Sequence, residues 1–96
     1  MAKRLGLDPA LLLDVLSRSG ASSRIMLRKI PAALAGDVDP GFAVRLAAKD
    51  LRLTLSTGGT VDAWLPVASA ISSVLEQSES VGLGDLDIAA VLRVFE

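Results

Sequence analysis

Three cations stand on one side of a predicted helix in the middle of the chain. Arg45, Lys49 and Arg52 are spaced i, i+4 and i+7, so at 100° per residue they form one row. Like charges at this spacing repel each other by roughly a few tenths of a kcal/mol per pair. A phosphate, a carboxylate or a docked acidic surface would relieve the repulsion, and Lys49, beside the Phe42 and Leu53 edge, is best placed to meet it. The alternative is that all three are solvated cations on the exposed strip of a core helix.

The composition excludes several kinds of chemistry. The 96 residues contain no Cys and no His, which removes zinc sites built on these ligands, disulfides, thiol nucleophiles and histidine relays. The formal net charge is -1, so no overall field draws the chain to nucleic acid or to an anionic membrane. The chain has neither the run of about 20 apolar residues that spans a bilayer nor a signal peptide, so we expect a cytoplasmic protein.

The acidic residues offer no second site. Asp37 and Asp39 begin like a calcium loop, but Gly41 stands at the next ligand position and no glutamate follows at the twelfth. Glu76 and Glu79 lie on the polar side of a predicted helix, where acid/base work would need a cleft that one helix face does not offer. We therefore expect no metal and assign these glutamates to a solvated face.

The hydrophobic pattern predicts an all-α chain, a single compact domain of about five helices over residues 1-96. Apolar residues make up 51%, but aromatics only 3%, and this Leu, Ala and Val mixture favours helices. Caps and turn residues place the helices over residues 9-16, from a Ser22 or Ser23 cap to about 30, over 42-56, over 66-81, and from an Asp87 cap to 95.

Proline and glycine should limit two of these helices. Pro31 lacks an N-H, so it should kink or end the second helix, with one further turn allowed over residues 32-35. Gly58 and Gly59 each weaken a helix by about 1 kcal/mol relative to Ala, so the third helix should fray there. The last helix should turn an apolar face inward, formed by Ile88, Val91, Leu92 and Phe95.

The third helix carries two apolar stripes on nearly opposite sides. A helix patterned in this way is expected to lie between two partners. One stripe consists of Val44, Ala48, Leu51 and Leu55, and the other of Phe42, Leu46 and Leu53.

Residues 40-53, with the sequence PGFAVRLAAKDLRL, resemble the hallmark segment of the β-hydroxyacid dehydrogenases. This family includes 3-hydroxyisobutyrate dehydrogenase and tartronate semialdehyde reductase. Further landmarks of the family are matched in the same order and at similar spacing by residues 6-9, 19-20, 65-66 and 82-87. The resemblance covers essentially the whole chain, and the segment from Phe42 to Lys49-Asp50-Leu51 is its most specific part.

The resemblance implies the C-terminal helical domain of such an enzyme, with a fold similar to the C-terminal domain of 6-phosphogluconate dehydrogenase. The Rossmann domain and the helix with the catalytic lysine would precede Met1, so we expect a fragment that is inactive alone and holds no catalytic residue. Lys49 matches the lysine of the family's Lys-Asp-Leu motif, which implies contact with NAD or NADP. Homo-oligomerisation, or pairing with the missing Rossmann domain, is also expected.

Two other kinds of function remain open. Residues 2-8 with the following Leu-rich helix also resemble the opening of a helix-turn-helix module. DNA binding would rest on Arg24, Arg28 and Lys29 in a net acidic chain that has few base-reading side chains, so we expect no nucleic-acid partner. A plain helical dimerisation module is the third possibility, because the high apolar content must be covered somewhere.

A departure from the family lies at residues 56-60, where the helix end should be shorter or looser.

Overall fold

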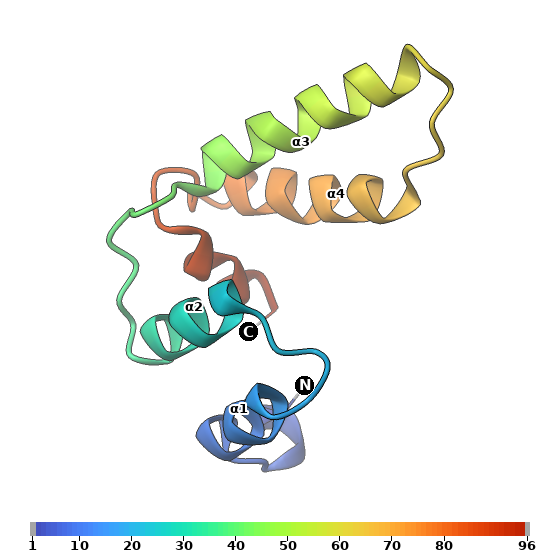
Figure 1. Ribbon diagram of the computed structural model, residues 1–96. Coiled ribbons are helices and arrows are strands. Elements are labelled where there is room, and N and C mark those ends of the chain that lie inside the picture. Colours follow the sequence, from blue (N-terminus) through green and yellow to red (C-terminus); the bar gives the residue numbers. More distant parts are fainter. Residues whose placement is uncertain (1, 96) are drawn as a thin grey trace. The chain divides into compact units, whose positions relative to one another are not determined.

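The computed structural model describes residues 2-95, which contain four α-helices, two 3-10 helices and no strand (Figure 1). The all-α prediction is confirmed. No helix in this part of the chain is both long and apolar enough to cross a membrane. The elements in chain order are η1 (Lys3–Leu5), α1 (Pro9–Ser17), α2 (Arg24–Leu34), α3 (Val44–Gly59), α4 (Pro66–Ser80) and η2 (Ile88–Phe95).

The chain divides after Asp37 into two compact units. Their assignment to one domain stays a prediction. In the first unit α1 contacts α2, and both predicted caps are confirmed: Asp8 Oδ1 accepts from Ala10 N at 2.9 Å, and Ser23 Oγ accepts from Met26 N at 3.1 Å. None of the side chains that the structure describes in this unit is buried.

Pro31 lies inside α2 and does not end it, because the helix continues to Leu34. A proline removes only its own N-H from the helical ladder, so one bond to the carbonyl of Leu27 is lost. The ladder then resumes, and Ala35 N donates to the carbonyl of Pro31 at 3.0 Å. The extra turn expected after Pro31 is therefore present.

The second unit is built on α3 and α4, which lie side by side (Figure 1). The first apolar stripe of α3 faces this contact: Val44 and Ala48 are buried together with Leu75 of α4. Burying a side chain such as Leu75 contributes roughly 1.5–3 kcal/mol. The partly buried side chains that complete the cluster are Ala47, Leu51, Ile88 and Val91.

The expectation that α3 frays at its glycines is wrong, because the helix runs through Gly59. Gly58 is buried, and a Cβ placed on it would lie 2.5 Å from Cδ1 of Leu65. The missing side chain therefore makes room for Leu65. The carbonyl of Gly58 also accepts from Val61 N at 3.1 Å and from Ala63 N at 3.0 Å, which closes the helix end.

The last element is the 3-10 helix η2, where an α-helix was expected. A 3-10 helix repeats every three residues, so Ile88 and Val91 share a face while positions four apart do not. Leu92 and Phe95, predicted to point inward, are accordingly exposed.

Candidate functional site

The segment that leads into α3 is anchored by one buried carboxylate. Asp87, which is 2% exposed, accepts through Oδ2 from Gly41 N at 2.9 Å and Phe42 N at 3.1 Å. Its Oδ1 accepts from Ala89 N at 3.0 Å, which confirms the predicted cap of the last helix. The backbone of Phe42 is held from the other side as well, because its carbonyl accepts from Ile88 N at 2.9 Å. Asp87 therefore ties the start of α3 to the start of η2.

The first backbone N-H groups of α3 are already occupied. No side chain caps the helix, but Val44 N donates to the carbonyl of Leu86 and Arg45 N to that of Gly84, both at 2.9 Å. A helix N-terminus binds an anion through free N-H groups of this kind. An anionic ligand of α3 would therefore have to be met by side chains further along the helix.

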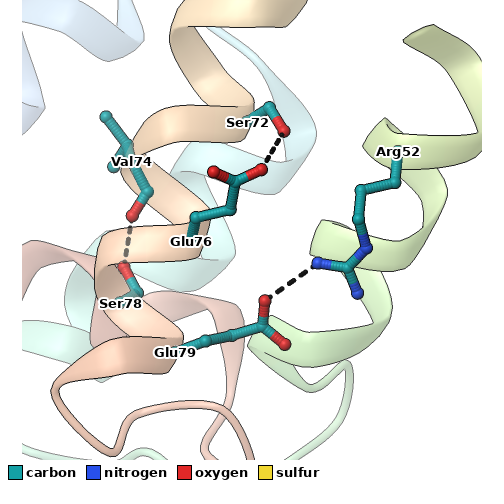
Figure 2. A network of polar contacts seen from close by, with 6 residues as sticks. All are labelled: Arg52, Ser72, Val74, Glu76, Ser78 and Glu79. Atoms are coloured by element: carbon teal, nitrogen blue, oxygen red, sulfur yellow. Dashed lines mark hydrogen bonds and ion pairs between the residues drawn. The ribbon is translucent and has the colours of Figure 1, made fainter. Parts of the chain in front are cut away.

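Two cations of the predicted row are paired with carboxylates from more distant parts of the chain. Arg45 Nε lies 2.7 Å from Asp85 Oδ1. Arg52 Nη1 lies 3.0 Å from Glu79 Oε2 of α4, a pair that Figure 2 shows. These pairs relieve the repulsion within the row and fasten α3 to α4 and to the loop after α4. The two arginines thus have a structural role that the sequence did not indicate.

Lys49 differs from the arginines beside it. Its Nζ lies 3.0 Å from Oδ1 of Asp50, the next residue of the same helix. Adjacent residues do not face each other on a helix, and both side chains are about half exposed, so this pair is weak and readily exchanged. Lys49 is therefore the cation of the row that is best able to meet a ligand.

An exposed apolar strip lies beside Lys49. Leu53, one turn further along α3, is 58% exposed, and Phe42, just before the helix, is 40% exposed. These residues belong to the second apolar stripe, which was expected to have a helical partner. Within the second unit, α4 contacts the opposite stripe, so Phe42 and Leu53 of this one stay exposed while Leu46 is partly buried. Lys49 and the apolar strip form the candidate site.

The residues that sequence analysis left without a role lie far from their partners along the chain. Asp85 was assigned nothing and Glu79 a solvated face, yet each pairs with an arginine of α3. No spacing rule indicates contacts over 40 and 27 residues. Within the part of the chain that the structure describes, no acidic group forms a cluster suited to a metal ion.

Residues 1–95 match the protein family described as NAD-binding of NADP-dependent 3-hydroxyisobutyrate dehydrogenase. The chain belongs to this family. The resemblance to β-hydroxyacid dehydrogenases is thereby confirmed, and the expected cofactor, NAD or NADP, agrees with the family's description. These matches do not favour the helix-turn-helix alternative.

Individual relatives give the same result. The chain is 33% identical over 93 residues to glyoxylate/succinic semialdehyde reductase 1 of Arabidopsis thaliana, which covers 97% of this chain and 32% of that protein. The solved 3-hydroxyisobutyrate dehydrogenase of Salmonella typhimurium matches with a TM-score of 0.93 at 28% identity, over 98% of this chain and 33% of that one. The chain thus spans about a third of the length of these relatives.

The chain is also similar to a protein whose name is not that of an enzyme. The cytokine-like nuclear factor N-PAC of Mus musculus is 30% identical to the chain over 95 residues, which make up 99% of this chain and 17% of that protein. Membership of the family therefore fixes the fold and the link to a dinucleotide more firmly than it fixes a reaction.

Proposed function

We propose that this chain forms one wall of the cofactor and substrate cleft of an NAD(P)-dependent β-hydroxyacid dehydrogenase, and that Lys49 contacts the dinucleotide. The observation that carries the proposal is the match of residues 1–95 to an NAD-binding family. A Rossmann domain would supply the rest of the cleft. The cytoplasmic location stays a prediction.

One side chain of the candidate site, that of Lys49, is suited to bind a dinucleotide. The start of α3 has no free N-H groups to offer at Val44 and Arg45, but Lys49 presents a cation on a flexible stem. A lysine ammonium can meet a phosphate or a ribose oxygen without the planar geometry that arginine prefers. On binding, Lys49 would exchange its weak pair with Asp50 for the ligand oxygen, and Leu53 would supply apolar surface beside it.

The reaction itself would depend on groups outside this chain. A bound nicotinamide supplies the hydride donor or acceptor. The candidate site holds no residue suited to move a proton at the substrate hydroxyl, because the chain has no His or Cys and Lys49 serves the cofactor. We therefore expect no turnover from the 96-residue chain alone.

Calorimetric titration of the chain with NAD and with NADP tests the assignment of Lys49. We expect weak binding of at least one dinucleotide, and Lys49→Ala should raise its Kd by about tenfold, which corresponds to about 1.4 kcal/mol. The matched control is Arg18→Ala, which removes an exposed cation in the first unit and should leave the Kd unchanged.

Two results would count against this assignment. An unchanged Kd in Lys49→Ala would show that another group binds the dinucleotide. Absence of heat with either dinucleotide would contradict binding by the chain on its own and would leave the family match as the support for a cofactor role.

A further inference from the structure

We propose that α2 carries a binding site for a small phosphate monoester, in which Arg24 and Arg28 hold the phosphate while Ile25 and Leu27 contact an apolar part of the ligand. All four residues belong to the first unit, whereas Lys49 belongs to the second. The proposal holds whether or not the chain binds a dinucleotide.

Arg24 and Arg28 are neighbouring cations without a counter-ion. They are spaced i, i+4 on α2, so their side chains share one face of the helix and repel each other. The helix contains no acidic residue, and neither side chain forms an ion pair within residues 2–95. By contrast, the guanidinium of Arg18 in α1 lies 2.9 Å from Asp14 Oδ1. An anion bound by both Arg24 and Arg28 would relieve their repulsion.

The two arginines line a hollow together with two apolar side chains. In the part of the chain that the structure describes, the hollow measures about 690 Å³ and is lined by Arg24, Ile25, Leu27 and Arg28. Ile25 is 52% and Leu27 43% exposed, so both can contact a ligand. Pockets for small molecules are of this size and combine apolar walls with a few charged groups. Cations and apolar surface therefore meet in one place on α2.

A phosphate monoester matches this combination of side chains. At pH 7 its charge is about −1.5 to −2, which two guanidinium groups can neutralise. Its terminal oxygens can accept hydrogen bonds from both arginines, whereas the two oxygens of a carboxylate can be bound by one arginine alone. A phosphate without an apolar part would leave Ile25 and Leu27 uncovered. The ligand class is therefore a phosphate monoester that carries a ring or an alkyl group.

The charge of the first unit favours the same class of ligand. Residues 1–37 contain six basic and three acidic side chains, a net charge of +3, although the whole chain has a net charge of -1. A nucleic acid would also be attracted to this unit, but nucleic acids are held through many phosphate contacts at once. The hollow offers two cations bordered by apolar side chains, so it fits a single phosphate group on a small molecule.

Titration of the ¹⁵N-labelled chain with phenyl phosphate, followed by NMR, tests the proposal. We expect saturable shifts of the amides from Arg24 to Arg28 with a Kd of roughly 1 mM, weaker binding of inorganic phosphate, and no binding of phenol, which lacks the phosphate. Raising the salt concentration should weaken binding, because the contacts are ionic. Arg24→Gln and Arg28→Gln should each raise the Kd by about fivefold, since each removes charge-assisted hydrogen bonds.

The matched control is Arg18→Gln, which removes a cation of the first unit that does not line the hollow and should leave the Kd unchanged. Ile25→Ser should weaken the binding of phenyl phosphate but not that of inorganic phosphate, because it removes apolar contact alone. Far-UV circular dichroism of each variant establishes that it folds.

Several results would overturn the proposal. One is the absence of saturable shifts with phenyl phosphate up to about 10 mM at low salt. Another is binding that persists in the double variant Arg24→Gln/Arg28→Gln but is lost in Lys49→Ala, which would place the phosphate on α3. A third is tight, salt-sensitive binding of a DNA duplex by a chain that does not bind phenyl phosphate, which would assign the two arginines to nucleic acid.

Discussion

Asp87 shows how much structure a single side chain can organise. Its two carboxylate oxygens accept three backbone N-H groups, two of which lie 45 and 46 residues earlier in the chain. A hydrogen bond to a charged group contributes about 1.5–3 kcal/mol, and an unsatisfied buried donor costs a similar amount. Because the bonds to Gly41 and Phe42 precede α3 directly, Asp87 also sets where Lys49 stands.

Asp87→Asn should lower the free energy of unfolding by about 2–4 kcal/mol. The substitution keeps the size of the side chain, but replaces one acceptor oxygen by an NH₂ group that faces backbone N-H donors. Urea denaturation followed by circular dichroism measures the change.

Asp85→Asn is the matched control, two residues away. The side chain of Asp85 is 89% exposed and makes one ion pair with Arg45, so its loss should cost less than about 1 kcal/mol. Equal losses of unfolding free energy in the two variants would show that burial and the three hydrogen bonds of Asp87 do not determine how much it stabilises the chain.

At the scale of the element, the two glycines at the end of α3 are not equivalent. Gly58 and Gly59 are adjacent and both helical, yet a Cβ on Gly58 meets Leu65 at 2.5 Å and one on Gly59 meets nothing within 4 Å. Helix propensity treats the two alike. The packing of Leu65 distinguishes them.

Gly59→Ala should stabilise the chain by up to about 1 kcal/mol, because alanine restricts the unfolded chain and favours the helix. Gly58→Ala should give less stabilisation or a net loss, because Leu65 must first move aside. The midpoints of thermal unfolding measure both variants. An equal rise of the unfolding midpoint in the two variants would mean that the Leu65 side chain can move aside without a cost in free energy.

At the scale of the whole molecule, the two units differ in how much they bury. The second has a core of Val44, Ala48 and Leu75, whereas none of the described side chains of the first is buried. Helices of 9 and 11 residues, the lengths of α1 and α2, are marginal without packing. The first unit exposes eight large apolar side chains, namely Leu5, Leu7, Leu11, Leu12, Val15, Ile25, Leu27 and Leu34.

Hydrogen exchange should therefore separate the two units. We expect amides of α1 and α2 to exchange through local opening at low free energy, and amides in the middle of α3 and α4 to exchange only near the free energy of global unfolding. Mass spectrometry of peptides from each unit measures the difference at low protein concentration. Equal protection of α1 and α3 would contradict this expectation, since it would require that the first unit's apolar side chains be covered.

Local features of this protein could be predicted from the sequence alone. The caps Asp8 and Ser23, the start of α4 at Pro66 and the row from Arg45 to Arg52 were found because capping and helical periodicity act over about four residues. The resemblance of residues 40-53 also indicated the family. It rests on the order of residue types along one continuous segment, so it can be recognised without knowing which residues are in contact.

Only the tertiary structure decided how these elements meet. The pairing of Arg45 with Asp85, the passage of α3 through Gly58 and the 3-10 form of η2 depend on which surfaces pack together. Each contradicts or goes beyond the local preference of the residues involved. Contacts between residues tens of positions apart arise from packing of the whole unit, and packing free energies of a few kcal/mol outweigh the fractions of a kcal/mol that local propensity supplies.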